Sequence, residues 1–226
     1  MPVRIVYHGH SNLEIHTGDH HIQIDPFYDE NPLADVKADK VSPGTILVTH
    51  AHWDHSDDVV KIAKRTGAEV ASNFEIASYY EKKGLTAQAM NHGGGVDFPW
   101  GRATYTLAFH TSSFGDGTYG GEAGGWVVET GGKVIYHAGD TALFGDMRLI
   151  GELWDIDLAC LPIGDRYTMG PAHALKAAGM LKAKAVLPIH YNTWPPIAQD
   201  PQAFAAQLQA RGIRGLPLKA GETAEV

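Results

Sequence analysis

The sequence predicts an α/β fold that forms one domain over residues 1–226. The chain has 226 residues, of which 44% are hydrophobic, so it can bury a sizeable core. Short apolar runs follow one another closely near the N-terminus, as in a β-meander, and later runs alternate with helical patterns. No linker-like segment and no run of like charges divides these elements. We therefore expect a single α/β domain.

The predicted strands are short runs of apolar and β-branched residues. Thr45–Thr49 is representative, because its apolar interior is typical of a buried parallel strand. In chain order, the expected strands are Val3–Tyr7, Asn12–His16, His21–Ile24, Thr45–Thr49, Glu69–Ala71, Ala103–Phe109, Gly125–Glu129, Lys133–Tyr136, Leu158–Leu161 and Ala185–Ile189.

The predicted helices begin at residues that favour a helix N-terminus. Ser56 offers an N-cap to the first, and two aspartates follow it in the first turn. Proline begins the last two, where the missing N–H group costs nothing. The expected helices are Ser56–Thr66, Asn73–Lys83, Ala142–Leu153, Pro171–Leu181 and Pro201–Arg211.

One segment between a predicted strand and helix reads H-A-H-W-D-H, from His50 to His55. Four of these side chains can bind metal, because zinc takes imidazole and carboxylate ligands. Alternate residues of an extended segment point the same way, so His50 and His52 can bind one ion. Asp54 and His55, beyond the turn, can reach a second ion about 4 Å away. The motif predicts a two-metal hydrolytic centre rather than a histidine-rich surface loop.

The composition limits the kinds of molecule that the protein is expected to bind. A formal charge of −8 argues against nucleic acid, whose binding depends on clustered Lys and Arg. No leader-like pattern opens the sequence, and no apolar run approaches the roughly 20 residues that span a bilayer. The single cysteine, Cys160, fits a reducing compartment. We expect a cytoplasmic protein that acts on a small-molecule substrate, with no membrane partner; formation of a homo-oligomer stays open.

The segment from His50 to His55 resembles the motif of the metallo-β-lactamase superfamily, in which H-x-H-x-D-H is followed by a distant His, Asp and His. His110, Asp140 and His190 match these distant positions, and each follows a predicted strand. The resemblance implies a four-layer αββα sandwich of two mixed β-sheets flanked by helices. It also implies a binuclear centre with one ion on His50, His52 and His110, the other on Asp54, His55 and His190, and Asp140 between them.

Further segments are similar to one branch of this superfamily, the small metal-dependent hydrolases related to the lactonase that opens ascorbate 6-phosphate. These segments are Gly9-His10-Ser11, Ile24-Asp25-Pro26, Tyr136–Thr141, Tyr167–Pro171 and Pro188–Thr193. The resemblance covers nearly the whole chain and implies a lactone or a phosphorylated metabolite as substrate, which can be anionic. Asp165 departs from the pattern, because a second small residue is expected there.

The expected cofactors are two divalent metal ions, zinc first, although manganese, iron, cobalt and nickel accept the same ligands. The ions would lower the pKa of a bridging water and so provide hydroxide as the nucleophile. Asp54 is the candidate for orienting that nucleophile. His10 is expected either to contact substrate and donate a proton or to make a structural hydrogen bond. Asp25 is expected to accept a hydrogen bond from a ligand imidazole, unless it is only a turn residue before Pro26.

Other side chains beside these motifs are candidates for substrate contacts. Asp165 and Arg166 would meet a polar substrate or form a solvated ion pair. Thr168 and Tyr191, together with Trp53, Tyr167, Met169 and Trp194, would form the pocket wall or pack in the core. Four further histidines, His8, His92, His137 and His173, are weaker candidates for the site, and their roles stay open. Three more, His16, His20 and His21, are expected to face solvent in a hairpin.

Two other functions stay open. A phosphodiesterase or nuclease on this fold would need a basic surface, which the acidic composition does not suggest. A non-catalytic metal-binding or sensing protein would use the same ligands. A glyoxalase-type thioesterase fits less well, because no added C-terminal region is seen, and an oxygen-reducing di-iron protein would carry Glu in place of His52.

Overall fold

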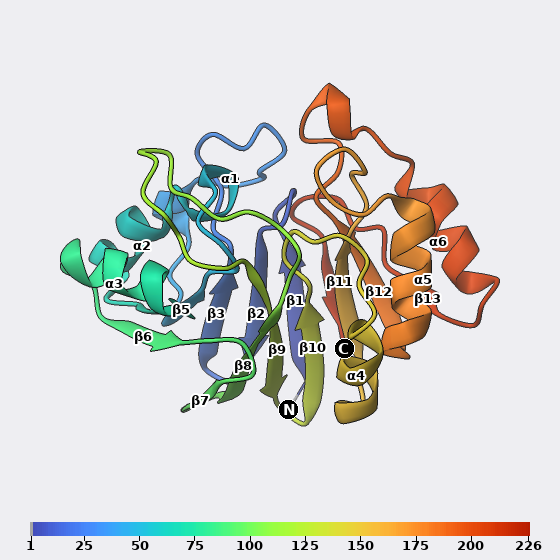
Figure 1. Cartoon of the computed structure of the whole chain (residues 1–226), viewed down its shortest axis with the longest axis horizontal. Helices are drawn as coiled ribbons and strands as arrows, with labels where there is room; N and C mark the ends of the chain where they lie inside the picture. Colours follow the sequence, from blue (N-terminus) through green and yellow to red (C-terminus); the bar gives the residue numbers. More distant parts are fainter. Residues whose placement is uncertain (1) are drawn as a thin grey trace.

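The computed structural model describes residues 2–226. Within these residues, two mixed β-sheets of seven strands each pack face to face, and helices cover their outer faces (Figure 1). This is the four-layer αββα sandwich that the resemblance implied, so the predicted fold class is confirmed.

The first sheet has the strand order β14-β1-β2-β3-β4-β5-β6. Its antiparallel part, from β14 to β3, is the predicted meander with one added strand, and β3 to β6 are parallel. The strands are β1 (Val3–Tyr7), β2 (Leu13–Thr17), β3 (His20–Ile24), β4 (Thr45–Leu47), β5 (Glu69–Asn73), β6 (Ala87–Met90) and β14 (Thr223–Glu225).

The second sheet repeats this plan with the order β13-β12-β11-β10-β9-β8-β7. Strands β7 to β10 are antiparallel and β10 to β13 are parallel. The strands are β7 (Gly95–Phe98), β8 (Gly101–Leu107), β9 (Gly124–Thr130), β10 (Lys133–His137), β11 (Leu158–Pro162), β12 (Ala185–Ile189) and β13 (Arg214–Gly215). Because parallel strands end at the same edge of a sheet, the segments after β10 and β12 emerge together.

The helices form the two outer layers. Ile62, Ile76 and Tyr80, on α2 and α3, pack against the first sheet, and Leu175 and Phe204, on α5 and α6, pack against the second. The helices are α1 (Trp53–Ser56), α2 (Val59–Thr66), α3 (Phe74–Lys82), α4 (Met147–Leu153), α5 (Pro171–Leu181) and α6 (Pro201–Gln209), and two 3-10 turns are η1 (Ala38–Lys40) and η2 (Pro195–Ile197).

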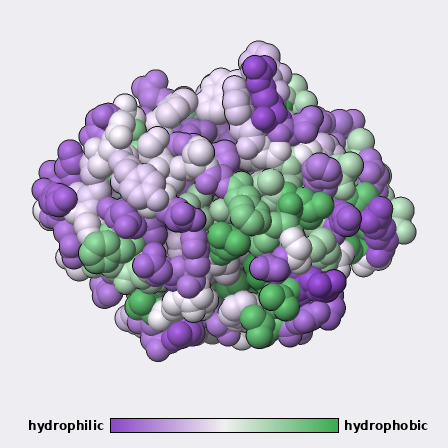
Figure 2. Space-filling view, viewed as in Figure 1, coloured by the Kyte–Doolittle hydropathy of each residue, from purple (hydrophilic) through white to green (hydrophobic). Residues whose placement is uncertain are grey.

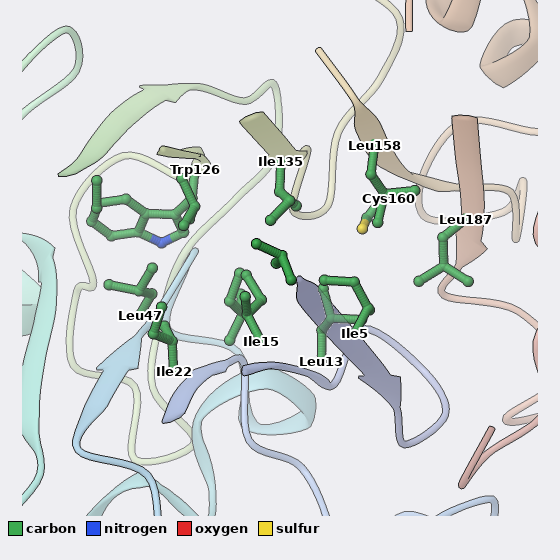
Figure 3. Packing of buried hydrophobic residues seen from close by; sticks show 14 of the residues in the cluster. Ile5, Leu13, Ile15, Ile22, Leu47, Trp126, Ile135, Leu158, Cys160 and Leu187 are labelled. Carbon is green, nitrogen blue, oxygen red and sulfur yellow. The ribbon is translucent and has the colours of Figure 1, made fainter. Parts of the chain in front are cut away.

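The central core lies between the two sheets, where apolar side chains from both point toward one another (Figure 3). Ile15 and Ile22 come from the first sheet, and Trp126, Ile135 and Cys160 from the second; all five are fully buried. Burial of a side chain of this size contributes about 1.5–3 kcal/mol, so this layer holds the two sheets in fixed relation. Cys160 is a packing residue here.

Several predicted boundaries were wrong. The expected helix Ser56–Thr66 is two helices, α1 and α2, and Ser56 ends the first of them instead of capping the second. Its hydroxyl donates to the carbonyl oxygens of Ala51 and His52. The helix expected from Ala142 begins at Met147. Strands β6, β7, β13 and β14 were missed, because they are short and poor in β-branched residues.

The face of the molecule drawn in Figure 2 is mostly polar, and hydrophobic residues gather on it over the region of α4. Leu149 and Leu153 on α4 are 50% and 71% exposed. None of the helices within residues 2–226 combines the length and the apolar character that crossing a bilayer requires.

Candidate metal centre

The predicted metal ligands come from four separate segments that meet at one edge of the sandwich. His50 and His52 follow β4, and Asp54 and His55 lie on the short helix α1. His110 lies three residues beyond β8, Asp140 three residues beyond β10, and His190 directly after β12. The structure brings all seven side chains together, although they span 141 positions from His50 to His190.

The first group of donors consists of His50, His52 and His110. Their donor nitrogens lie within 4.8 Å of one another. His50 Nε2 is 3.0 Å from His52 Nδ1, and both rings lie 5.1 Å from the His110 ring, centroid to centroid. Three imidazole nitrogens converging on one point are the donor set of a zinc ion.

The second group consists of Asp54, His55 and His190, together with His10. Asp54 Oδ2 is 3.9 Å from His55 Nε2 and 3.8 Å from His190 Nε2. His190 adopts a left-handed backbone, with φ of 53°, which turns its side chain back from the strand toward the group. A carboxylate and two imidazoles can again hold a divalent ion.

Asp140 lies between the two groups. Its Oδ2 atom is 2.9 Å from His190 Nε2 and 3.6 Å from His110 Nε2, and its Oδ1 atom is 3.4 Å from His55 Nε2. The turn before it depends on Gly139, whose φ is 60° and where a Cβ atom would lie 2.4 Å from the carbonyl oxygen of Gly124. Asp140 is therefore placed where one carboxylate can touch both donor sets.

Asp25 orients one of the imidazoles from behind. It is fully buried, and its Oδ2 atom lies 2.7 Å from His55 Nδ1 and 2.6 Å from the Thr49 hydroxyl that donates to it. The Thr49 amide donates to Oδ1 at 2.8 Å. Because the carboxylate can only accept, His55 carries its proton on Nδ1 and presents Nε2 to the centre.

Thr49 extends this orientation to the first group. Its hydroxyl proton is given to Asp25, so the oxygen can only accept from His50 Nδ1, which lies 3.0 Å away. The Nε2 lone pair of His50 is then free to face His52 and His110. One buried carboxylate thus fixes the tautomers of ligands in both groups.

His10 is fully buried and is not among the residues that line the cavity above the centre, which favours the expected alternative of a structural hydrogen bond. Its Nε2 atom lies 3.0 Å from Asp54 Oδ2, and its Nδ1 atom 2.7 Å from the Thr193 hydroxyl. Burial and the neighbouring His190 lower the pKa of His10 to about 4, so the ring is neutral at pH 7. A neutral His10 donates from Nε2 to Asp54 and accepts from Thr193 at Nδ1.

The charge balance of the site fits bound cations. Asp25, Asp54 and Asp140 bring three carboxylates into contact with His55, and none of them has a Lys or Arg partner within the described residues. Burial raises the pKa of Asp140, but the imidazoles of His190 and His55 outweigh it and hold that pKa well below its usual range. Buried negative charge is costly without a counter-charge, which two divalent ions would supply.

Two buried atoms among the candidate metal ligands also indicate bound cations. His55 Nε2 and Asp140 Oδ1 have no hydrogen-bond partner within the described residues, although each is shielded from solvent. Buried polar atoms are almost always partnered, so such atoms at a cluster of ligands indicate a group that the protein atoms do not supply. A metal ion between the donors would satisfy both.

A cavity of about 520 Å³ opens above the centre. His52, Asp54, His110, Asp140 and His190 line it from the site itself. The rest of the wall is largely aromatic and aliphatic, formed by Trp53, Thr111, Tyr167, Trp194, Pro196 and Ile197. A pocket of this size admits a small molecule, with the predicted metal ligands on one side and apolar surface on the other.

Comparison with known proteins identifies the family. Residues 20–191 match the model of the β-lactamase superfamily domain. A UPF0173 metal-dependent hydrolase of Thermus thermophilus is 54% identical over 220 residues, which cover 97% of each chain. The chain belongs to the UPF0173 metal-dependent hydrolase family. The Bacillus subtilis member is 48% identical over 229 residues, which cover 99% of this chain and all of the relative.

A solved structure gives the same result for the fold of this UPF0173 protein. Igni18, a metallo hydrolase from the archaeon Ignicoccus hospitalis, superposes with a TM-score of 0.92 at 35% identity, covering 100% of this chain and 99% of that one. An isothiocyanate hydrolase from Delia radicum gut bacteria, at 19% identity and a TM-score of 0.77, shares the fold.

Three predicted substrate contacts of the UPF0173 chain lie outside the cavity. Asp165 is exposed in a turn, and the Thr168 hydroxyl is directed to a backbone oxygen, that of Met169. Tyr191 packs in the core of the second sheet, with its hydroxyl 3.4 Å from the carbonyl oxygen of Leu218. For Tyr191 the structure favours the core-packing alternative, because proximity in sequence to a ligand does not fix the direction of a side chain. Met169 is likewise a core residue.

The histidines without a predicted role are now placed. His92 stacks on Tyr105 and contacts the carbonyl oxygen of Ala123, and the buried His137 contacts the carbonyl oxygen of Ser11. His173 is exposed on α5. Thr49 and Thr193, which hold ligand or neighbouring imidazoles, were missed. Thr49 directly precedes the His50–His55 motif and Thr193 ends the segment Pro188–Thr193, but a threonine carries no signal of its own.

Proposed function

We propose that this UPF0173 protein is a binuclear metal-dependent hydrolase that acts on a small molecule with an apolar part, with a lactone as the first candidate. One observation carries the proposal: two donor groups, joined by Asp140, lie beneath a cavity whose remaining wall is mostly apolar. A sensing protein needs the ions but has less need of an open cavity over them.

The donors divide between two ions, zinc being the first choice. His50, His52 and His110 would hold one, Asp54, His55 and His190 the other, and Asp140 would contact both. Such ions lower the pKa of bound water toward neutrality and polarise an oxygen of the substrate. The protein supplies imidazole tautomers that Asp25 and Thr49 hold fixed.

Asp54 is the residue we propose to handle the proton. Burial raises its pKa, but the neighbouring imidazole of His55 and the hydrogen bond from His10 outweigh it, so the carboxylate is ionised at neutral pH. Its side chain lines the cavity and can hold a proton at an oxygen that faces the substrate. His10 and Thr193 position this carboxylate from behind.

The wall of the cavity favours a compact substrate that carries an apolar group. Trp53 and Trp194 lie with ring centroids 5.5 Å apart, and Phe27 packs edge-on against Trp53 at 5.2 Å. Rings fixed by such contacts offer a rigid surface to a hydrocarbon ring or chain. The charged groups of the lining are the predicted ligands, so a phosphorylated substrate would depend on the ions for recognition.

The test is a substrate panel with zinc-loaded protein. We expect turnover of lactones or simple esters, with kcat/KM at least about a hundredfold above that for phosphodiesters. Metal analysis should give at least two ions per chain in the active preparation. Turnover of phosphodiesters alone would instead establish the phosphodiesterase, and two bound ions without turnover of any panel member would favour the sensing protein.

A graded series of variants tests the order of roles around Asp54. Asp54→Asn should lower kcat by about 10²–10⁴-fold, because the amide cannot accept the proton. His10→Ala should cost about tenfold to a hundredfold, and Thr193→Val less, because these residues only position the carboxylate. Steady-state kinetics on the best substrate measures all three. If His10→Ala were more damaging than Asp54→Asn, the acid–base role would pass to His10.

A further inference from the structure

A second cluster of metal-competent side chains lies on the outer face of the first sheet. Glu14 and His16 are two residues apart on β2, so they point to the same face. His21 on β3 is the direct antiparallel partner of His16. One donor atom from each of the three lies within 4.8 Å of the others. The prediction that His16 and His21 simply face solvent was wrong, whereas His20 is exposed as expected.

The three donors have the spacing of a metal site. His16 Nε2 and His21 Nε2 lie 2.8 and 3.0 Å from the same oxygen of Glu14, Oε2. Ligand atoms around a tetrahedral zinc ion with bonds of 2.0–2.1 Å are about 3.3 Å apart, so small movements would admit an ion. The two imidazole rings stack at 4.3 Å with planes 21° apart, which directs both nitrogens to one side.

Glu14 is held in place independently of these two histidines. Its side chain is only 7% exposed, and its other oxygen, Oε1, lies 3.4 Å from His8 Nε2 and 3.2 Å from the Tyr28 hydroxyl. His8 is in turn fixed by Asp35, with Nδ1 2.6 Å from Oδ1. Asp35 thus orients His8, and His8 contacts Glu14. Metal ligands are commonly supported by a chain of contacts of this kind.

The charge of this cluster suits a cation. Burial raises the pKa of Glu14, but the neighbouring imidazoles of His16, His21 and His8 outweigh it and hold the pKa well below its usual range. Glu14 is therefore ionised, whereas His21 Nε2 and His8 Nε2, although close to it, make no well-formed hydrogen bond within the described residues. A nearly buried carboxylate surrounded by imidazoles needs either protons on the rings or a metal ion.

The cluster is separate from the hydrolase site. His21 is near the start of β3, whereas Asp25 of the hydrolase site follows its other end. The two residues are four positions apart along the chain, which is about 13 Å at 3.3 Å per residue. An ion at the hairpin would therefore not touch the donors around Asp140.

We propose that Glu14, His16 and His21 form a second, non-catalytic binding site for a divalent transition-metal ion such as zinc. Two imidazoles and a carboxylate provide three ligands, and the fourth position faces solvent through His16 and His21, which are 26% and 18% exposed. The ion links β2 to β3 and thereby stabilises the hairpin that leads into Asp25.

The test counts zinc ions in the full-length protein after dialysis against a slight excess of zinc. We expect His16→Ala and His21→Ala each to bind one ion fewer per chain than the wild type, with kcat and KM on the best substrate unchanged. His20→Ala is the matched control, because it removes an exposed imidazole of the same strand, and it should keep the wild-type count. Added zinc should raise the Tm of the wild type and of this control by at least about 5 °C at a hundredfold excess over Kd.

An unchanged zinc count in both His16→Ala and His21→Ala would overturn the proposal and leave protonated imidazoles around Glu14. Glu14→Gln adds a further check, because it keeps the size of the side chain and removes its charge. If this variant folds and binds as many ions as the wild type, the site is likewise refuted.

Discussion

Asp140→Asn is expected to lower kcat/KM by about a thousandfold or more, which corresponds to about 4 kcal/mol of transition-state stabilisation. The amide keeps the size of the side chain, but it has no charge. Its NH₂ group also cannot bind a metal ion in place of the carboxylate oxygen. Since Asp140 is the side chain that touches both donor groups, we expect the metal content to fall as well.

The metal-free variant should still fold, but with lower stability than metal-free wild type. The imidazoles of His190 and His55 hold the pKa of Asp140 well below its usual range, so loss of its charge removes favourable interactions with them. Mass spectrometry of bound metal, kinetics and thermal unfolding measure the three effects. Asp146→Asn is the matched control, an exposed aspartate before α4 without a side-chain cap, and it should behave as wild type.

If Asp140→Asn retained two ions and most of its activity, the bridging position would be wrong and each donor group would hold its ion alone. Full activity with one ion would point to a mononuclear enzyme on the second group. Loss of activity together with loss of fold, seen as a large fall in Tm of the metal-free protein, would make Asp140 a structural residue.

The candidate metal ligands could be predicted from the sequence, because four of them form one local motif and the other three each follow a predicted strand. H-x-H-x-D-H places four donors within six residues, and the distant His110, Asp140 and His190 each follow an apolar run, so the structure brings together what the pattern implied. The four-layer fold, by contrast, came from the resemblance. Periodicity gives strands and helices but not which strands pair across two sheets.

The roles of residues beside the motifs could not be decided from the sequence. Asp165, Tyr191 and His10 were each open to two interpretations, because whether a side chain enters a cavity depends on local backbone direction. His10 and Asp165 both adopt a left-handed backbone conformation, with φ of 58° and 72°, and no local sequence pattern predicted it. The cluster at Glu14 was missed for the related reason that it depends on hairpin register, which pairs His16 with His21.

We expect that Gly139→Ala, which adds a single methyl group, destabilises the protein more than the same addition elsewhere in the site. The added Cβ would lie 2.4 Å from the carbonyl oxygen of Gly124 and 3.0 Å from the Thr49 Cβ, and φ at Gly139 is 60°. Left-handed strain and overpacking each cost about 1–3 kcal/mol, so we expect a loss of about 3 kcal/mol in the free energy of unfolding and a fall of about 10 °C in Tm.

The same substitution tests whether this turn sets the position of Asp140. The backbone must move to relieve the clash, and Asp140 is the next residue, so the folded fraction should also lose metal affinity and activity at temperatures well below its Tm. Gly145→Ala is the matched control, because nothing lies within 4 Å of its added Cβ, and its stability should change by less than about 0.5 kcal/mol. A Gly139→Ala protein that is destabilised but fully active when folded would show that Asp140 keeps its place by contact with the ions rather than through the turn.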